Sequence, residues 1–352
     1  MLSEGRLNKL RQNNIYDLRN HFSEADSIKS KLMYGAAVDK EVDLSIVIPA
    51  YNRTDVLMRA IRSSIGQNSH NIAYEVVICD NSTSSDTTNY IVTELNKIDD
   101  SRVRYYVNET NIGMFNNWNR CVYLAKGKYV AILHADDWLA DNYISETMRI
   151  LKKYNDIDWL SVRPMNKILS DIGEDKIYKV PFELTTIGGY FPIQCSVFKR
   201  DVFIEHGGFS TDSYIEDLVL KKTMSFYKQV YVYNRELYFQ GSDEQSASFN
   251  VNWEDELIYE YYYDLCSVNI RKGLIKHILK AYLRKEIIGK VERYIDGDSY
   301  FNRAVRLDKK SFMEACQIKE GIHGFFDTVF RKIYGFDRRL AVRKMKRTGR
   351  TL

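Results

Sequence analysis

The hydrophobic pattern between residues 43 and 133 alternates between short apolar runs and longer amphipathic segments. The apolar runs are rich in β-branched residues and predict strands buried on both faces, at residues 43–50, 74–80, 103–107 and 128–133. The amphipathic segments predict helices between these strands, at residues 54–64, 86–97 and 114–125. Because strands that alternate with helices of this length form βαβ units, the pattern predicts an α/β fold with a mostly parallel sheet flanked by helices.

Beyond residue 137 the alternation weakens and the pattern becomes helical. Two further strands and one helix are expected, at residues 159–165, 177–181 and 214–227. From residue 253 onward the sequence is first tyrosine-rich and then basic, and it contains no strand-like run. With a boundary near Ser246, we divide the chain into an N-terminal helical extension, an α/β domain and a helical C-terminal region with a basic tail, at residues 1–42, 43–245 and 246–352.

The composition, with 45% hydrophobic and 28% charged residues, is typical of a globular protein and excludes the disordered and fibrous classes. No run approaches the roughly 18 consecutive apolar residues of a membrane-spanning helix, and the first residues lack the apolar core of a signal peptide. We therefore expect a cytoplasmic protein. The five cysteines stand singly without C-x-x-C spacing, which indicates neither a zinc site nor a disulfide framework.

The net charge of +4 is the sum of two unlike parts. Nine Lys and Arg residues and one acid, Asp337, follow residue 330, so this tail carries +8 and the remaining residues −4. Apolar residues stand beside the cations of this tail, which is typical of helices that lie on an anionic membrane surface. A helix that packs its apolar stripe on the rest of the protein explains the pattern equally well. Nucleic acid is not expected as a partner, because no binding motif accompanies the charge.

Three of the predicted strands are followed directly by polar side chains. In open α/β sheets ligands bind at the carboxyl ends of the strands, so these strand ends form the predicted site. They are the segments Pro49-Ala50-Tyr51-Asn52, Asp80-Asn81 and His134-Ala135-Asp136-Asp137. Asp80 also fits a turn residue that bonds to its own backbone.

The segment at residues 134–137 places two adjacent carboxylates at a strand end, where they would repel one another without a bound cation. Oxygen ligands favour Mg²⁺ or Mn²⁺, and the nearby imidazole of His134 favours Mn²⁺. We therefore predict a metal site formed by His134, Asp136 and Asp137. The alternative is that Asp136 or Asp137 caps a helix that starts near Asn142.

A second acidic pair, Glu216 and Asp217, stands at the start of a predicted helix after the turn Gly207-Gly208-Phe209. The helix dipole alone also favours acidic residues at this position. Two adjacent carboxylates raise each other's pKa, which would suit a general base that works near neutral pH.

Five segments, in order along the chain, resemble the motifs of family 2 glycosyltransferases with the GT-A fold. They are Leu44–Arg53, Val77–Thr83, Asn111-Ile112-Gly113 with Asn119 and Ala125–Tyr129, the Asp136-Asp137 segment, and Gly207-Gly208-Phe209 with Glu216-Asp217. The resemblance covers about residues 43–245. It implies a GT-A, Rossmann-like catalytic domain and an enzyme that takes a sugar from a nucleotide-sugar donor.

The resemblance also implies roles at the donor site. Asp80 would accept a hydrogen bond from the imide N–H of a uracil-like base, so a UDP-sugar is the expected donor. The other expected donor contacts are Pro49, Tyr51, Asn52, Arg53, Asn111, Gly113, Asn119, Ala135 and Asp136. Residues 134–137 correspond to the family's D-x-D element, which holds Mn²⁺ or Mg²⁺ against the donor phosphates, although His134 replaces its first acid.

In the same resemblance Asp217 is the general base of an inverting transfer, and Glu216 is its neighbour at the acceptor site. A base must reach the acceptor hydroxyl while a cation neutralises the departing diphosphate, so the two acidic clusters would supply one function each. The family's Tyr-Arg-x-His stretch lacks its histidine after Tyr233-Asn234-Arg235, and Asp243 is the candidate replacement for this third metal ligand.

The resemblance favours transfer of a single sugar to a glycan or a lipid-linked acceptor, because the Gln-x-x-Arg-Trp signature of processive synthases is absent. A lipid-linked acceptor would place the protein on the inner face of the cytoplasmic membrane, where the basic tail meets anionic lipid. The alternative is a catalytically silent GT-A domain that binds a nucleotide or a glycan, since His134 departs from the motif. A nucleotidyltransferase is not favoured, because residues 49–52 do not form a glycine-rich phosphate loop.

Overall fold

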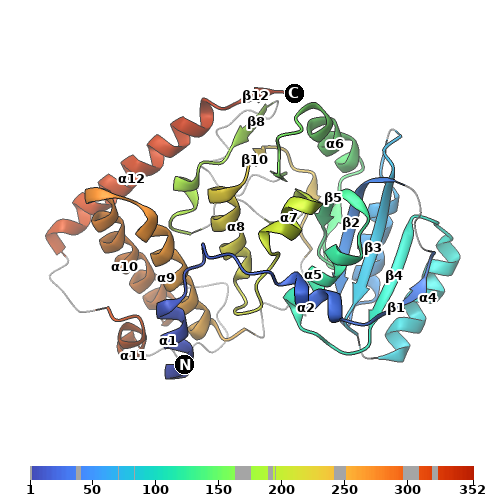
Figure 1. Cartoon of the computed structure of the whole chain (residues 1–352), viewed down its shortest axis with the longest axis horizontal. Coiled ribbons are helices and arrows are strands. Elements are labelled where there is room, and N and C mark those ends of the chain that lie inside the picture. The colour runs from blue at the N-terminus through green and yellow to red at the C-terminus, as the bar shows by residue number, and fades with distance from the viewer. Residues whose placement is uncertain are drawn as a thin grey trace.

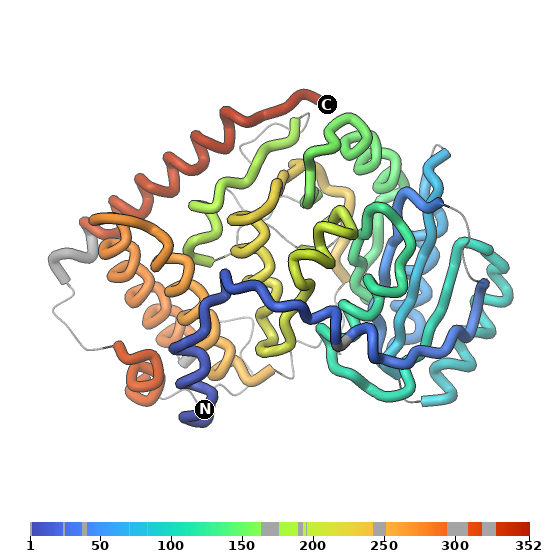
Figure 2. Tube along the Cα trace, viewed as in Figure 1, coloured from blue at the N-terminus to red at the C-terminus, as the bar shows by residue number. Residues whose placement is uncertain are grey.

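A large mixed sheet with helices on both faces is packed beside a helical region (Figure 1). The computed structural model describes residues 2–36, 41–69, 71–82, 84–162, 176–188, 193–194, 196–241, 251–295, 309–318 and 324–352. The N-terminal segment starts beside the helical region and runs across to the far edge of the sheet (Figure 2).

The main sheet has ten strands in the order β1-β4-β3-β2-β5-β9-β7-β10-β8-β12. They are β1 (Ser30–Tyr34), β2 (Val42–Ala50), β3 (Tyr74–Asp80), β4 (Val103–Asn108), β5 (Gly127–Ile132), β7 (Trp159–Ser161), β8 (Lys176–Lys179), β9 (Val197–Lys199), β10 (Val230–Tyr233) and β12 (Arg350–Thr351). A separate pair is formed by β6 (Trp138–Leu139) and β11 (Tyr238–Phe239). Strands β4, β3, β2 and β5 are parallel, whereas β9 lies antiparallel between β5 and β7.

The helices that connect the parallel strands lie where the sequence predicts them. They are α3 (Asp55–Ile65), α4 (Ser85–Ile98) and α5 (Met114–Leu124). Later in the chain, α8 (Glu216–Tyr227) also matches a predicted helix, and α6 (Tyr143–Lys153) and α7 (Arg200–His206) are further helices of the domain. This arrangement confirms the predicted α/β fold with flanking helices. Of the expected strand at 159–165, residues 159–161 form β7, and 163–165 lie outside the described residues.

Both faces of the central strands are buried, which explains why their sequences are almost continuously apolar. Successive side chains point to opposite faces, so Ile46 and Ile48 pack with α3, α4 and α6, whereas Val47 packs with α5 and α7. The two apolar layers hold the carboxyl ends of the parallel strands at one edge, where the predicted site lies.

The C-terminal region is helical, as expected. It contains α9 (Trp253–Ile270), α10 (Gly273–Ile295), α11 (Lys309–Ala315) and α12 (Gly324–Lys346). Together with α1 (Glu4–Gln12), helices α9 to α11 form a third apolar core. None of the helices in the described ranges is long and apolar enough to cross a membrane.

Two strands at the ends of the chain correct the sequence prediction. Residues 1–42 are not entirely helical: after α1 and α2 (Phe22–Ser27), β1 pairs antiparallel with the edge strand β4. Near the other end, β12 pairs antiparallel with β8 although no strand is expected after residue 253. Both strands are short, with five and two residues, so neither forms an alternating pattern long enough to predict a strand. The boundary near Ser246 lies outside the described residues and stays a prediction.

A buried ion pair ties the amino ends of three parallel strands together. The carboxylate of Glu75 in β3 pairs with the guanidinium of Arg104 in β4, and both side chains are 2% exposed. The same carboxylate accepts hydrogen bonds from Ser45 Oγ of β2, at 2.6 Å, and from the backbone N–H of Lys126, at 2.7 Å. Because Oε1 accepts these two hydrogen bonds and Oε2 pairs with the guanidinium, this buried charge is compensated.

Arg104→Met should destabilise the protein by about 3–5 kcal/mol, because it leaves the charge of Glu75 buried without its partner. Urea denaturation followed by circular dichroism measures the loss. Arg62→Met is the matched control, since Arg62 is 59% exposed where it pairs with Glu94 and should lose at most about 1 kcal/mol. Equal losses in the two variants would contradict the structural importance of the buried pair.

Candidate active site

Three buried asparagines hold the carboxyl ends of β2, β3 and β4 together. The side-chain amide of Asn117 in α5 donates to the carbonyl oxygens of Ala50 and Cys79, at 3.2 and 2.9 Å. The amide of Asn108 donates to Asn81 Oδ1 and Asn117 Oδ1, at 2.7 and 2.9 Å. Sequence reasoning missed Asn108 and Asn117 as site-forming residues. The sequence features that could have identified them are the position of Asn117 on the buried face of a predicted helix and that of Asn108 at the end of a predicted strand.

The loop after β2 presents exposed side chains at this edge. Tyr51 is 49% exposed, and Asn52 has a left-handed backbone with φ of 50°. The N–H of Asn52 donates to Ser82 Oγ at 2.7 Å, which ties this loop to the turn after β3. Arg53 is partly exposed beside them, so residues 51–53 are available to a ligand. Pro49 is not, because it lies buried within β2 opposite Cys79.

Asp80 is fully buried, and both of its carboxylate oxygens already accept hydrogen bonds. Oδ1 accepts from the backbone N–H and the hydroxyl of Ser82, at 2.8 and 2.6 Å, and Oδ2 accepts from the Tyr105 hydroxyl at 2.7 Å. These bonds fit the turn role that the sequence left open. Recognition of a base by Asp80 would require one of its oxygens to become accessible.

The predicted donor contacts on and before α5 separate into exposed and buried residues. Asn111 is exposed, and its Oδ1 accepts from the N–H of Gly113 at 2.9 Å. Asn119 is fully buried instead: its amide donates to the carbonyl of Phe209 and accepts from the N–H of Phe209, at 2.7 and 2.9 Å. A Cβ on Gly208 would lie 2.6 Å from Asn119 Oδ1, which explains the glycine there. Asn119 therefore joins two of the sequence motifs, and its burial in this structure leaves its side chain away from the surface where a donor contact was predicted.

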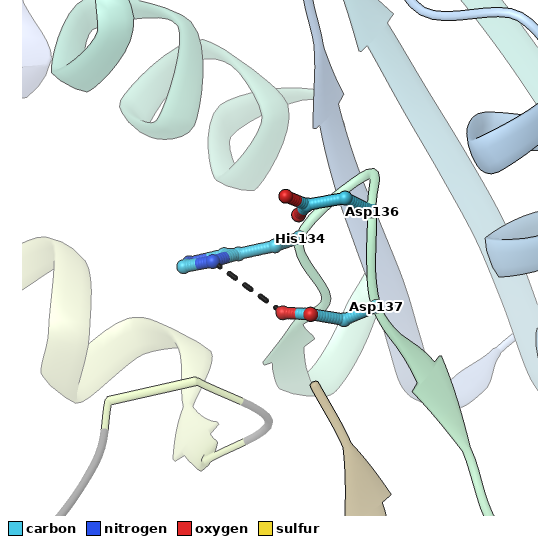
Figure 3. A group of neighbouring side chains, drawn as sticks. All are labelled: His134, Asp136 and Asp137. Atoms are coloured by element: carbon cyan, nitrogen blue, oxygen red, sulfur yellow. Dashed lines mark ion pairs between the residues drawn. The ribbon is translucent and has the colours of Figure 1, made fainter. Parts of the chain in front are cut away.

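The acidic loop after β5 brings the three predicted metal ligands together (Figure 3). One ligand atom from each of His134, Asp136 and Asp137 lies within 4.8 Å of the others. Asp137 is 2% exposed and accepts from the N–H of Gly241 at 2.8 Å and from the Tyr238 hydroxyl. These bonds orient Asp137 and occupy both of its oxygens.

The free donors of this loop fit a divalent cation. Asp136 is partly exposed, and Nε2 of His134 is buried with no partner among the described residues. Burial lowers the pKa of His134, against the opposing charges of Asp136 and Asp217, and so favours the neutral ring that can bind a metal. Neither acid caps α6, whose N-cap residue is Asn142, so the capping alternative is wrong. Ala135 is buried beneath the loop.

At the start of α8, the two residues of the second acidic pair lie in different environments. Asp217 is 31% exposed, and its Oδ2 lies 2.6 Å from Nζ of Lys221 one turn later. The charge of Asp217 opposes the lowering of the His134 pKa, so this carboxylate lies within electrostatic range of the acidic loop. The fold therefore brings the two predicted clusters, 80 residues apart in sequence, near each other.

Glu216 turns into the protein. Its side chain is 1% exposed, and Oε1 accepts from the Tyr263 hydroxyl at 2.7 Å and from Ser213 Oγ at 3.2 Å. Burial raises the pKa of Glu216 to about 8, and the carboxylates of Asp212 and Glu256 add to the effect. We expected Glu216 and Asp217 to raise each other's pKa. This is wrong for Glu216, because its raised pKa is caused mainly by burial.

The segment that stands where the family has Tyr-Arg-x-His packs against α6. The Tyr233 hydroxyl donates to Glu146 at 3.0 Å, and Arg235 lies 3.5 Å from the same carboxylate. Asp243, the candidate third ligand, lies outside the described residues.

Comparison with known sequences places this site in a family. Residues 45–207 match the family profile described as Glycosyl transferase family 2. This part of the chain belongs to glycosyl transferase family 2. Over 109 residues it is 35% identical to the UDP-Glc:alpha-D-GlcNAc-diphosphoundecaprenol beta-1,3-glucosyltransferase WfaP of Escherichia coli, covering 31% of this chain and 41% of that protein. Over 234 residues it is 25% identical to the GalNAc(5)-diNAcBac-PP-undecaprenol beta-1,3-glucosyltransferase of Campylobacter jejuni, covering 64% and 73%.

Solved structures agree with the GT-A fold. S. aureus TarS 1-349, solved in complex with UDP-GlcNAc, superposes with a TM-score of 0.53 at 14% identity, covering 87% of this chain and 91% of that one. The mannosyltransferase PcManGT from Pyrobaculum calidifontis, in complex with GDP-Man and Mn²⁺, gives 0.51 at 14% identity, covering 98% and 88%. The family 2 domain therefore has the GT-A fold that the sequence motifs imply.

Glu216→Gln should remove a pH-dependent loss of stability. With a pKa of about 8, Glu216 keeps its proton in the folded state, whereas the unfolded chain releases it above about pH 4.5. The folded state binds more protons, so the stability contributed by this group is present below pH 4.5 and is lost as the pH rises toward 8, by up to about 1 kcal/mol per pH unit. The free energy of unfolding of Glu216→Gln, relative to the wild type, should therefore increase from pH 5 to pH 8 in urea denaturation.

Glu205→Gln is the matched control, because the Glu205 side chain is 73% exposed on the neighbouring helix α7. Its stability relative to the wild type should stay nearly constant over the same pH range. A constant difference for Glu216→Gln would contradict the raised pKa.

Proposed function

We propose that this protein is an inverting glycosyltransferase that moves a single sugar from a UDP-sugar to a hydroxyl of a lipid-linked or glycan acceptor, in cell-surface polysaccharide or glycoconjugate biosynthesis. The observation that carries the proposal is the cluster of His134, Asp136 and Asp137 at the carboxyl edge of a GT-A sheet, with the charge of Asp217 within electrostatic range of it. The donor and acceptor classes are supported by the names of the E. coli and C. jejuni relatives, which specify undecaprenol-linked acceptors, and by the UDP-GlcNAc complex of TarS.

Asp217 has the geometry of the base in this proposal. Its carboxylate is partly exposed and is oriented by Lys221 at 2.6 Å. Asp217 would take the proton of the acceptor hydroxyl as the hydroxyl oxygen attacks the anomeric carbon, while the bond from that carbon to the donor diphosphate breaks on the opposite face. This displacement inverts the configuration at the anomeric carbon.

Asp136 and His134 are the residues that would hold Mn²⁺ or Mg²⁺, because their ligand atoms are close together, the Asp136 carboxylate is partly exposed, and Nε2 of His134 has no partner among the described residues. When bound, the cation supplies positive charge to the departing diphosphate. Asp137 would keep the loop in place through its bonds to Tyr238 and Gly241. The exposed residues Tyr51, Asn52 and Arg53 would contact the nucleotide.

The alternative, a silent GT-A domain that only binds a nucleotide or glycan, is favoured by His134 in place of the first acid. Calorimetry with UDP and Mn²⁺, combined with a donor-hydrolysis assay over a panel of UDP-sugars, separates the two. Binding without turnover of any donor would favour the silent domain.

Asp217→Asn should lower the rate of sugar transfer by about 10²- to 10⁴-fold, since the amide cannot accept the proton. The affinity for UDP in the presence of Mn²⁺ should stay unchanged, as measured by calorimetry. Asp136→Asn should have the opposite effect, with Mn²⁺-dependent UDP binding lost. Asp201→Asn is the control, because its side chain is 93% exposed on α7. Undiminished transfer by Asp217→Asn would remove this residue from its assigned role.

The outer face of α12 suits the anionic membrane surface on which a lipid-linked acceptor would be presented. Ala341 and Met345 are buried against the catalytic domain, so one face of the helix packs as the sequence alternative requires. The other face exposes Phe336 and Leu340, 54% and 44% exposed, beside the exposed cation Arg339. Exposed apolar residues flanked by cations are typical of helices that lie in a membrane interface.

Replacing both Phe336 and Leu340 by Ser should weaken flotation of the full chain with vesicles that contain anionic phosphatidylglycerol, because the apolar contacts with the interface are lost. Arg339→Glu should weaken it further, since each surface cation contributes on the order of 1 kcal/mol. Leu32→Ser, at an exposed site on β1, should leave flotation unchanged. Flotation that is equal for all variants, or that does not need anionic lipid, would argue against α12 as the contact.

A further inference from the structure

A pocket outside the donor site lies between the N-terminal segment and the first turns of α8. It is formed by residues 13–21, the turn at 206–212, the first half of α8 and Tyr263 of α9, and it spans about 520 Å³ including its open mouth. Glu216 lines this pocket, but Asp217 and residues 134–137 do not. The N-terminal segment crosses the molecule here on its way to the sheet edge (Figure 2).

Two residues that line this pocket each carry a buried polar atom with no partner among the described residues: Nδ1 of His206 and Oε2 of Glu216. The two residues are 3% and 1% exposed. Buried polar side-chain atoms nearly always have a hydrogen-bond partner, because leaving one unpaired costs about 1–3 kcal/mol. Two such atoms on residues that line one pocket indicate that a bound polar molecule supplies their missing hydrogen-bond partners.

The hydrogen-bond network determines which of the two atoms donates. The arrangement that satisfies both bonds has the Thr223 hydroxyl donating its one hydrogen to the carbonyl of Val219, at 3.0 Å, and accepting from Nε2 of His206, at 2.8 Å; we assign the His206 tautomer accordingly. Burial lowers the pKa of His206 to about 4, so the ring is neutral and Nδ1 is an acceptor.

Glu216 presents the opposite character. Its Oε1 already accepts from Tyr263 and Ser213, and near neutral pH the proton that its raised pKa retains is left on Oε2. Oε2 is therefore a donor. The pocket offers one acceptor and one donor, which is the complement of a molecule that carries hydroxyl groups.

The remaining lining suits a neutral ligand. Ile15, Leu18 and Val219 supply apolar surface, while Asp212 lies 3.6 Å from Lys9 and Asp17 accepts from the side-chain amide of Asn14. Among the described residues, the group of three potential metal ligands is the acidic loop at 134–137 and not this pocket.

We propose that this pocket binds a monosaccharide unit, with one sugar hydroxyl donating to Nδ1 of His206 and another accepting from Oε2 of Glu216. The proposal is independent of the transfer reaction, because no residue of the donor site takes part. An occupant would also hold Glu216, and with it the first turn of α8 that carries Asp217. The unit can be a free sugar or one residue of a larger glycan, since both offer the same hydroxyls.

Saturation-transfer NMR on the full chain tests the pocket, with glucose, N-acetylglucosamine, their methyl glycosides and cellobiose as probes. Excess UDP and Mn²⁺ are present throughout, so that the donor site is filled. At least one probe should show saturation transfer. Signals from the free monosaccharides alone would assign the pocket to free sugars, and signals from the glycosides and cellobiose as well would extend it to glycan residues.

Leu18→Trp should reduce the signal at least fivefold, because Leu18 lines the pocket mouth and is 42% exposed, so the larger ring blocks entry without disturbing a core. Leu340→Trp is the matched control, a leucine of similar exposure on α12. His206→Gln should also abolish the signal, since its amide can replace Nε2 but leaves no acceptor at Nδ1. His206→Asn, which places a polar atom near Nδ1, should retain part of it.

Three results would overturn the proposal: no saturation transfer to any probe, a signal that depends on the absence of UDP, or a signal that survives in Leu18→Trp. Thermal melting of each variant establishes that a lost signal reflects the pocket and not unfolding. A variant that melts early is replaced by Val219→Phe, which fills the pocket from α8.

Discussion

The site depends on one side-chain amide, that of Asn117, which bridges the carbonyl oxygens of Ala50 and Cys79 where the parallel strands β2 and β3 end. Strands that separate at their carboxyl ends leave carbonyl groups without ladder partners, and a buried carbonyl left unpaired is costly. Asn117 bonds two of them at once, that of Ala50 together with the backbone N–H of Asn81, and Asn108 and Asn81 continue the network to the loop before α5. The strand ends are thereby held at a fixed separation, with their loops on one side.

The positions of the surrounding loops depend on this network. The turn after β3 is closed by Asp80 and Ser82, and Ser82 in turn holds the backbone of Asn52. The acidic loop follows β5, which pairs directly with β2, and is braced from the other side by Tyr238 and Gly241. Exposed ligand-binding groups are thus carried on a buried polar scaffold, which explains how a loop site can keep its geometry.

The start of α8 shows how burial gives neighbouring acids different properties. Glu216 and Asp217 are adjacent, yet one is enclosed by Tyr263 and Ser213 and the other is partly exposed beside Lys221. A buried carboxyl retains its proton, whereas an exposed one paired with a cation is favoured as the anion. The environment, and not the residue type, therefore suits the two acids to the different roles proposed for them, Asp217 as a base and Glu216 as a proton donor.

Local patterns in the sequence were sufficient for the parallel core, its connecting helices and the position of both acidic clusters. Strand burial, helix amphipathicity and the placement of polar residues at strand ends all act over a few residues, so they are readable along the chain. The short strands β1 and β12 were not readable, because each forms by pairing with a sheet edge far away in sequence.

Which polar side chains remain free for a ligand depended on the folded structure. Asp80, Asn119, Asp137 and Glu216 all have the character of ligand-binding residues in the sequence. In the fold they are taken by Tyr105, Phe209, Tyr238 and Tyr263, which are 25, 90, 101 and 47 positions away. A hydrogen-bonding group is consumed by whichever partner the tertiary packing brings within about 3 Å, and no local pattern specifies that partner.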